Sequence, residues 1–259
     1  IGHSGEYADW KINSENARLP DGQGKDISFY EQNNFGGYKS YHVFGKYTDF
    51  FGAYWHSENF GMGRYSTHDE KPGKKIWIWG LSQQGMIWDK LLTDTDGQYV
   101  EVQSGRLFNQ AAEQSTFTPF KHPGFAPSIS DSWIEYWFPI KGTKGFVQAN
   151  LYGALNLRYE KGYLKIDFSP LQDITGELKI ADGESLLYSK TISVKTLKLF
   201  SDSLAFVGNV NNLSVVLGET KLTYHSNPSD GILNRPVESP SDFDWTSSYG
   251  LYLLGKENV

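Results

Sequence analysis

Cysteine is absent from the 259 residues of this chain. Its absence excludes disulfides, thiolate metal sites and cysteine nucleophiles. It assigns no compartment, because an oxidising space permits disulfides without requiring them. The chain begins at Ile1 rather than at Met, so we expect any targeting signal to lie outside it. The localisation therefore stays open, and secretion or a periplasmic location is the first expectation where such a signal was removed.

Long apolar runs and an excess of positive charge are also missing. No run reaches the roughly 18 apolar residues of a membrane helix, so we expect no membrane insertion. Lys and Arg number 24 against 30 Asp and Glu, for a net charge of -6 at pH 7. Without a basic field, nucleic acid is not an expected partner. The six His show no His-Glu-x-x-His motif, and we expect neither a metal site nor a cofactor.

Aromatic residues, by contrast, make up 15% of the chain, and seven of the eight Trp precede residue 150. Alternation of period two predicts strands in this Trp-rich part, and we expect them in one mainly antiparallel sheet system. A helix is expected around 83–92. The expected strands are 75–79, 99–103, 133–138 and 145–151.

From about residue 156 the chain predicts short strands spaced every 8 to 12 residues or so, the pattern of a small immunoglobulin-like β-sandwich. We therefore expect an all-β protein with a Trp-rich domain over 1–155, a sandwich over 156–226, and an extended linker with a short helix over 227–259. The expected sandwich strands are 164–168, 176–180, 185–190, 196–200, 204–207, 213–216 and 221–224.

Two strands carry a carboxylate on the face opposite their apolar side chains, since residues two apart share a face. Glu135 stands between Trp133 and Trp137 in this phase, and Glu101 shares a face with Tyr99 and Gln103. If one sheet holds these strands, the polar faces converge. Carbohydrate recognition uses such residues, because sugar rings pack on aromatic rings and hydroxyls pair with carboxylates and amides.

Trp79 shares a face with Trp77 on the expected strand 75–79, opposite Ile76 and Ile78, and is a further part of the expected sugar platform. Crowding by Trp disfavours the charged carboxylate and should raise the pKa of Glu135, which suits a general acid or base. The alternative is a carboxylate that simply meets an Arg. We name Glu135 and Glu101 as the candidate catalytic pair.

Three polar residues complete the candidate site. Arg106 can bind a ligand carboxylate or sulfate, or form an ion pair with Glu101 or Glu135. Gln110 belongs to the amide-rich segment that follows. His68 lies in a loop with two adjacent carboxylates, which is either solvated or forms a rim over a ligand.

A resemblance rests on residues 73–80 (GKKIWIWG), 92–94 (LTD), 97–106 (GQYVEVQSGR), Gln110 and 135–140 (EYWFPI). In this order they resemble a bacterial domain-of-unknown-function family found ahead of tetratricopeptide repeats. That family is similar to the galactose mutarotase-like supersandwich. The resemblance covers about residues 36–140.

The resemblance implies a supersandwich, in partial form because the recognised motifs belong to its later part. It also implies tetratricopeptide-type helices downstream, beyond 251–255 (LYLLG). Mutarotases pair a Glu base with a His acid, and only the position of Glu135 can be carried over here.

Two functions remain open at this point. The first is a carbohydrate-active protein that binds and processes a glycan through a cleft lined by Trp and Glu, as a glycoside hydrolase, a glycosyltransferase or an epimerase-like enzyme. The second is a non-catalytic carbohydrate-binding or protein-interaction module. One fold hosts both, so the site must decide between them.

Overall fold

The computed structural model describes residues 2–3, 39–43, 47–71, 73–79, 82–94, 97, 99–107, 126–231 and 242–257. Strands dominate this part of the chain and helices are few, as expected for an all-β protein. The elements are β1 (Gly2–His3), β2 (Lys39–Val43), β3 (Phe50–Trp55), β4 (Phe60–Tyr65), β5 (Gly73–Ile78), α1 (Gln83–Leu91), β6 (Val100–Gly105), β7 (Tyr136–Lys141), β8 (Gln148–Asn150), β9 (Gly153–Glu160), β10 (Tyr163–Pro170), β11 (Ile174–Asp182), β12 (Ser185–Val194), β13 (Phe200–Ala205), η2 (Val210–Asn212), β14 (Leu213–Leu217), β15 (Leu222–His225) and α2 (Ser248–Glu257).

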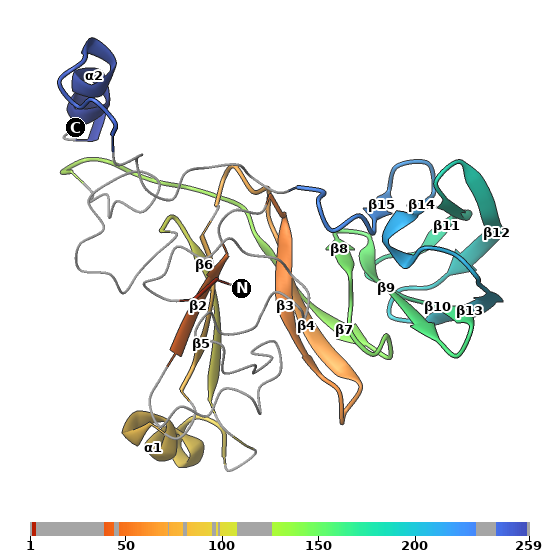
Figure 1. Ribbon diagram of the computed structural model, residues 1–259. Helices are drawn as coiled ribbons and strands as arrows, with labels where there is room; N and C mark the ends of the chain where they lie inside the picture. The colour runs from red at the N-terminus through yellow and green to blue at the C-terminus, as the bar shows by residue number, and fades with distance from the viewer. Residues whose placement is uncertain are drawn as a thin grey trace. The chain divides into compact units, whose positions relative to one another are not determined.

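The described residues divide into two compact units, each assembled from separate stretches of sequence. Unit 1 draws on 1–47, 69–132 and 232–259, and unit 2 on 48–68 and 133–231. Unit 1 holds the sheet β1-β2-β5-β6 and the helices α1 and α2 (Figure 1). Unit 2 holds three further sheets, in the orders β3-β4-β7, β13-β10-β9-β8 and β12-β11-β14-β15.

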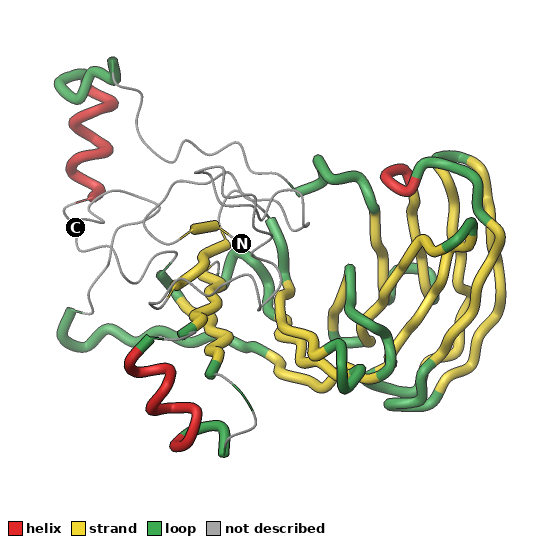
Figure 2. Tube along the Cα trace, turned by 60° about the horizontal axis from the view of Figure 1, so that its bottom comes forward, coloured by secondary structure: helices red, strands yellow, loops and turns green. Residues whose placement is uncertain are grey.

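Two four-stranded sheets of unit 2 enclose one apolar core, and Figure 2 shows their strands curling around it. Along β10, Leu164, Ile166 and Phe168 point into this core and are almost wholly buried. Ile180 on β11 and Val215 on β14 meet them from the other sheet. Strict alternation selects this arrangement, because a slip of one residue would turn every apolar side chain outward.

A second core of unit 2 lies against the three-stranded sheet β3-β4-β7, where Phe138 and Ile140 of β7 pack with Ala149 of β8 and Ala154 of β9. Phe138 lies in register with Gly63 on β4. A Cβ at Gly63 would come within 2.4 Å of the Phe138 ring, so only glycine leaves room for the ring here. β4 therefore accepts a large aromatic neighbour at the cost of a side chain of its own.

The expectation of one sheet for the Trp-rich strands is wrong. β5 pairs with β6, but β7 pairs with β4 and β8 pairs with β9, which places these strands in three sheets. The periodicity of each strand was sufficient to find it, but β4, which separates β3 from β7, carries Gly61 and Gly63 and lacks a strand pattern. Pairing partners could not be read without it.

Several local expectations are confirmed. The helix expected at 83–92 is α1, whose first turn is capped by Ser82: the Gly85 N–H donates to Ser82 Oγ at 3.0 Å. α2 is the expected C-terminal helix, and the Gly250 N–H donates to Ser247 Oγ at 3.0 Å.

The strands expected at 196–200 and 204–207 form the single strand β13, which begins only at Phe200. Residues 195–198 make a turn instead, with Leu197 at a positive φ of 59°. The boundaries 1–155, 156–226 and 227–259, the supersandwich and the immunoglobulin-like sandwich stay predictions.

Candidate functional site

One face of the β5–β6 pair in unit 1 gathers most of the expected site residues. Trp77 is in register with Glu101, and Lys75 with Gln103. Since side chains two apart share a face, Lys75, Trp77 and Glu101 stand on the same side of the pair, with Gln103 beside them. We call this the aromatic face and define it by Lys75, Trp77, Trp79, Trp88, Tyr99, Glu101 and Gln103.

Four rings follow one another along the aromatic face. Trp77 stacks on Trp79 with centroids 5.8 Å apart, and Trp79 meets the edge of Trp88 at 4.4 Å. Trp88, supplied by α1, meets the edge of Tyr99 at 5.3 Å. These four side chains are half-buried, so each keeps some ring surface toward solvent. Such rings offer stacking area that is already held in place.

Glu101 is the carboxylate of this face. Gln103 Nε2 donates to Glu101 Oε2 at 2.6 Å, and the Tyr99 hydroxyl also hydrogen-bonds to Glu101. Burial raises the pKa of Tyr99, and the neighbouring Glu101 charge and this hydrogen bond raise it further. Tyr99 therefore stays a protonated donor, and Glu101 is held from two sides.

Lys75 brings a buried amine to the same face. Its side chain is only 4% exposed, and burial lowers the pKa of Lys75 to about 8. A lysine in this condition loses its proton more readily than a surface lysine and can act as a base near neutral pH.

Arg106 forms an ion pair in unit 1 with Asp131, a residue outside the predicted site. Its Nε lies 3.2 Å from Asp131 Oδ2, and the same oxygen accepts a hydrogen bond from Lys71 Nζ at 2.9 Å. Asp131 thus bridges two cations. The Lys71 hydrogen bond has the largest effect on the pKa of Asp131 and lowers it. Burial is the next largest effect and opposes it, while the Lys71 and Arg106 charges and a backbone hydrogen bond from Ser132 add to the lowering, so the pKa lies below its ordinary value.

Glu135 belongs to unit 2, where it pairs with Arg64 of β4. Arg64 Nε donates to Glu135 Oε2 at 2.9 Å. Arg64 is wholly buried, whereas the Glu135 side chain is 24% exposed. The Arg64 guanidinium also lies 5.9 Å from the centre of the Phe51 ring, which meets Trp137 edge-on at 6.2 Å. This grouping follows from register, since Phe51, Arg64 and Trp137 are cross-strand neighbours in one row.

His68, also in unit 2, is buried rather than placed on an open rim. Its backbone N–H donates to Asp49 Oδ1 at 2.8 Å. Its ring Nδ1 lies 3.3 Å from the Thr48 carbonyl oxygen and 3.5 Å from the Thr48 nitrogen. The contacts fasten the chain after β4 to the residues before β3.

The structure thus brings Trp79, Tyr99, Glu101 and Gln103 together in unit 1, and Glu135 and Trp137 into one group in unit 2. Trp133 is 43% exposed in unit 2. Gln110 lies outside the described residues. Convergence through a single sheet fails as a mechanism, because β6 and β7 belong to different sheets.

Arg64, Lys75 and Trp88 were not predicted from the sequence as site residues. A signal for Lys75 existed, since it shares the phase of Trp77 and Trp79. Trp88 lies on the expected helix, but nothing in the sequence aimed it at Trp79. Arg64 directly follows Gly63 and lies outside the strands expected from the sequence, so no periodicity pointed to it.

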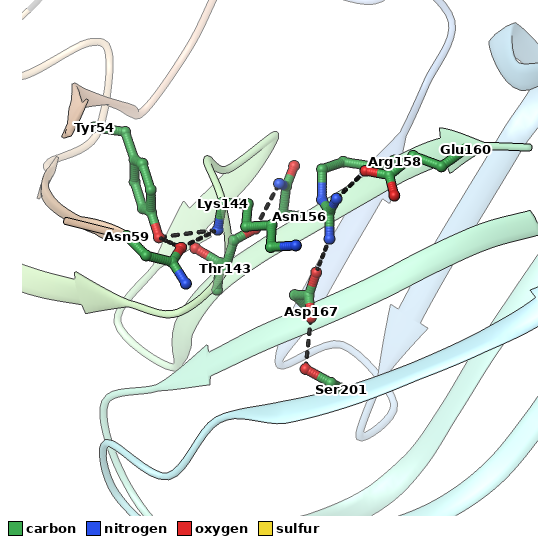
Figure 3. A network of polar contacts seen from close by, with 9 residues as sticks. All are labelled: Tyr54, Asn59, Thr143, Lys144, Asn156, Arg158, Glu160, Asp167 and Ser201. Carbon is green, nitrogen blue, oxygen red and sulfur yellow. Dashed lines mark hydrogen bonds and ion pairs between the residues drawn. The ribbon is translucent and has the colours of Figure 1, made fainter. Parts of the chain in front are cut away.

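A polar network in unit 2 covers the outward face of β9 and β10 (Figure 3). Arg158 Nη2 donates to Asp167 Oδ2 at 2.7 Å and Arg158 also pairs with Glu160, while Ser201 Oγ donates to Asp167 Oδ1 at 2.6 Å. Asn156 Nδ2 donates to the Thr143 carbonyl at 2.7 Å.

The next residue, Lys144, donates its backbone N–H to Tyr54 and Asn59. These bonds pin the loop after β7 between β9 and the β3–β4 turn, which is a structural role.

No group of three or more His, Cys, Asp or Glu side chains suited to holding a metal ion occurs among the described residues. Over the same part of the chain, neither α1 nor α2 combines the length and hydropathy needed to cross a bilayer.

Comparison with protein families matches residues 1–140 to a domain of unknown function, DUF5107. No solved structure gave a significant match. The matched region contains β1 to β6 and most of β7, and therefore the whole aromatic face and the Arg64–Glu135 pair. It covers more than half of the chain. The chain belongs to the DUF5107 family of domains of unknown function.

Proposed function

We propose that the protein binds carbohydrate through the aromatic face of unit 1. The observation that carries the proposal is the run of four contacting rings from Trp77 to Tyr99 beside the hydrogen-bonded Glu101 and Gln103. Rings of this kind receive the C–H face of a sugar, and a carboxylate beside an amide pairs with its hydroxyls.

Glu101 is the proposed acid/base if the bound glycan is processed. It lies beside the rings, is half-buried, and is oriented by Tyr99 and Gln103. Positioning by two donors is what a group that accepts or delivers a proton requires. Lys75 on the same face is a second proposed proton-transfer group, so that Glu101 and Lys75 together could supply an acid and a base.

A binding test uses a glycan array followed by calorimetry on the glycans that bind. Trp79→Ala should weaken binding by one to three orders of magnitude, because it removes the central ring of the run. Trp55→Ala is the matched control: Trp55 is an exposed tryptophan of unit 2 that stacks on Phe60. Equal losses in both variants, or no binding by the wild type to any glycan, would remove the proposal.

Turnover is tested separately by NMR, which follows hydrolysis or anomer exchange of a bound glycan. Glu101→Gln should retain binding within a few-fold and lose turnover, since the amide keeps the size and loses the proton. Glu184→Gln, in the exposed turn between β11 and β12, is the control. Binding without turnover in the wild type would assign the protein as a non-catalytic carbohydrate-binding module.

A further inference from the structure

Arg64 has two nitrogen atoms that its known contacts leave unused. Glu135 occupies Nε, and the Phe51 ring lies beside the guanidinium, but Nη1 and Nη2 have no hydrogen-bond partner among the described residues. Both atoms are fully enclosed. A charged donor that is enclosed and unpaired destabilises the fold unless a partner from outside the chain accepts its hydrogen bonds.

Ser66 has the same property two residues further along. Its Oγ is enclosed and has no hydrogen-bond partner in the part of the chain that the structure describes. Arg64 and Ser66 are two positions apart on an extended stretch, and the Ser66 N–H continues the pairing with β3 by donating to the Asp49 carbonyl at 3.0 Å. The Arg64 guanidinium and the Ser66 hydroxyl therefore lie on one side of this extended stretch, and both have unused hydrogen-bonding atoms.

The position of Glu135 shows where that partner enters. Its carboxylate touches the guanidinium and is itself 24% exposed. Trp137, in register with Arg64, is 43% exposed. Solvent therefore reaches to within one side chain of the unpaired nitrogens, beside an indole ring.

Charge decides the class of partner. Glu135 already neutralises Arg64, and Asp49 adds a second carboxylate whose charge is felt at Tyr65, the residue between Arg64 and Ser66. These two carboxylates would oppose the binding of an anion. A hydroxyl group has no charge, accepts from a guanidinium and donates to a carboxylate at once. Two adjacent hydroxyls match the two free nitrogens.

We propose that Arg64, Ser66 and Glu135 form a subsite for an uncharged vicinal diol, covered by Trp137. Nη1 and Nη2 donate to the two hydroxyl oxygens, a hydroxyl donates to Glu135, and Ser66 takes part as donor or acceptor. The subsite rests on the proposed carbohydrate ligand for its natural occupant, but none of its residues belongs to the aromatic face. Arg64 and Ser66 are thereby assigned as binding residues, with Glu135 as their acceptor.

The test follows the Arg64 Nε–H signal by NMR in the full chain while small probes are added. The probes are cis-1,2-cyclohexanediol, cyclohexanol and acetate. The diol should shift the signal saturably, with an affinity about tenfold above that of cyclohexanol, because the second hydroxyl adds a hydrogen bond to a charged donor. Arg64→Lys identifies the signal, and the probes are compared on the wild type.

Ser66→Ala should weaken diol binding by about fivefold to tenfold. Ser193→Ala is the control, since Ser193 is an exposed strand serine of unit 2 that bonds only Thr175 among the described residues. Trp79→Ala, which tests the aromatic face, should leave the diol titration unchanged. The two proposals can therefore fail independently.

Acetate binding in place of the diol would overturn the assignment in favour of an anion site. Equal affinities for diol and cyclohexanol would overturn it in favour of apolar contact with Trp137. A signal that no probe moves would show a closed structural ion pair and would also overturn it.

Discussion

Lys71 Nζ donates to Asp131 Oδ2 at 2.9 Å and so joins two residues of unit 1 that are 60 positions apart. The lysine is almost wholly buried, and its hydrogen bond is the largest of the effects that hold the pKa of Asp131 below 3.8. A carboxyl group of this kind stabilises the fold above its unfolded pKa, and the stabilisation is lost as pH falls through the folded pKa.

Asp131→Asn should therefore unfold at a lower temperature than the wild type at pH 7, because the variant leaves the buried Lys71 charge without its carboxylate. The gap between the melting temperatures of the two proteins should narrow as the pH falls through the lowered folded-state pKa of Asp131, because the wild-type carboxylate is then protonated as well. Thermal unfolding followed by circular dichroism measures both. Asp230→Asn, at an exposed turn, should show no such convergence; a constant gap for Asp131→Asn at all pH values would contradict the prediction.

Lys75→Met should stabilise unit 1 at pH 7 by on the order of 2–3 kcal/mol, because it removes a buried charge whose pKa is lowered to about 8 from 10.5. Below pH 8 Lys75 is protonated in both the folded and the unfolded wild type, so the full free-energy cost of burying its charge opposes folding. Between pH 8 and 10.5 the unfolded state binds more protons, and wild-type stability rises with pH.

Urea unfolding at pH 7 and pH 9.5 measures this difference. The advantage of the variant should shrink at the higher pH. The measurements stop at pH 9.5 to avoid tyrosine ionisation. Tyr188 has a raised pKa in the folded state, so above about pH 10 its ionisation in the unfolded state would lower stability. An advantage that stays equal at both pH values would show that burial of the Lys75 charge is not its cause.

Ser82→Ala should lower the free energy of unfolding by about 1 kcal/mol, the usual effect of losing an N-cap. Its distinctive consequence concerns Trp88, since α1 holds that ring 4.4 Å from Trp79. The near-ultraviolet circular dichroism signal of the coupled rings should therefore weaken in Ser82→Ala at temperatures below the melting temperature of the whole protein. The same signal should stay unchanged in Ser247→Ala, which removes the cap of α2. Equal spectra for wild type and Ser82→Ala would show that the cap does not position the ring.

Ile180→Ala should destabilise unit 2 by about 2–5 kcal/mol, because Ile180 is wholly buried in the core of its two four-stranded sheets. Val207→Ala should change stability by less than about 0.5 kcal/mol, because that side chain is fully exposed. Guanidinium unfolding of each variant measures both, and a small loss for Ile180→Ala would contradict the assignment of this core.

The same residues show how far the sequence could predict this fold. Ile180 and the other alternating apolar residues after 156 predicted β10 to β15, because each of these strands has one buried face, whereas β9 was not predicted. Trp77, Glu101 and Gln103 shared a face as their spacing required, and this part of the candidate site was readable. Local periodicity carried both results.

Pairing between distant strands was not readable. β4 could not be predicted, because Gly61 and Gly63 interrupt the alternation of apolar side chains that identifies a strand. Gly63 has no side chain because the Phe138 ring fills that space. With β4 hidden, the pairing of β7 and the Arg64 counter-charge of Glu135 were hidden as well. Register between residues 71 positions apart depends on tertiary packing that no local stretch of sequence contains.

The interleaved order of the two units has a consequence for synthesis on the ribosome. β4 gains its second neighbour, β7, only after the chain for α1, β5 and β6 has emerged. Until then β4 is an open edge of the β3–β4 hairpin, and its unpaired backbone N–H and C=O groups can pair with a strand of another chain. The nascent chain therefore has a vulnerable interval, during which a chaperone that covers a strand edge should raise the yield of folded protein, and a pause in translation after β6 should lower it.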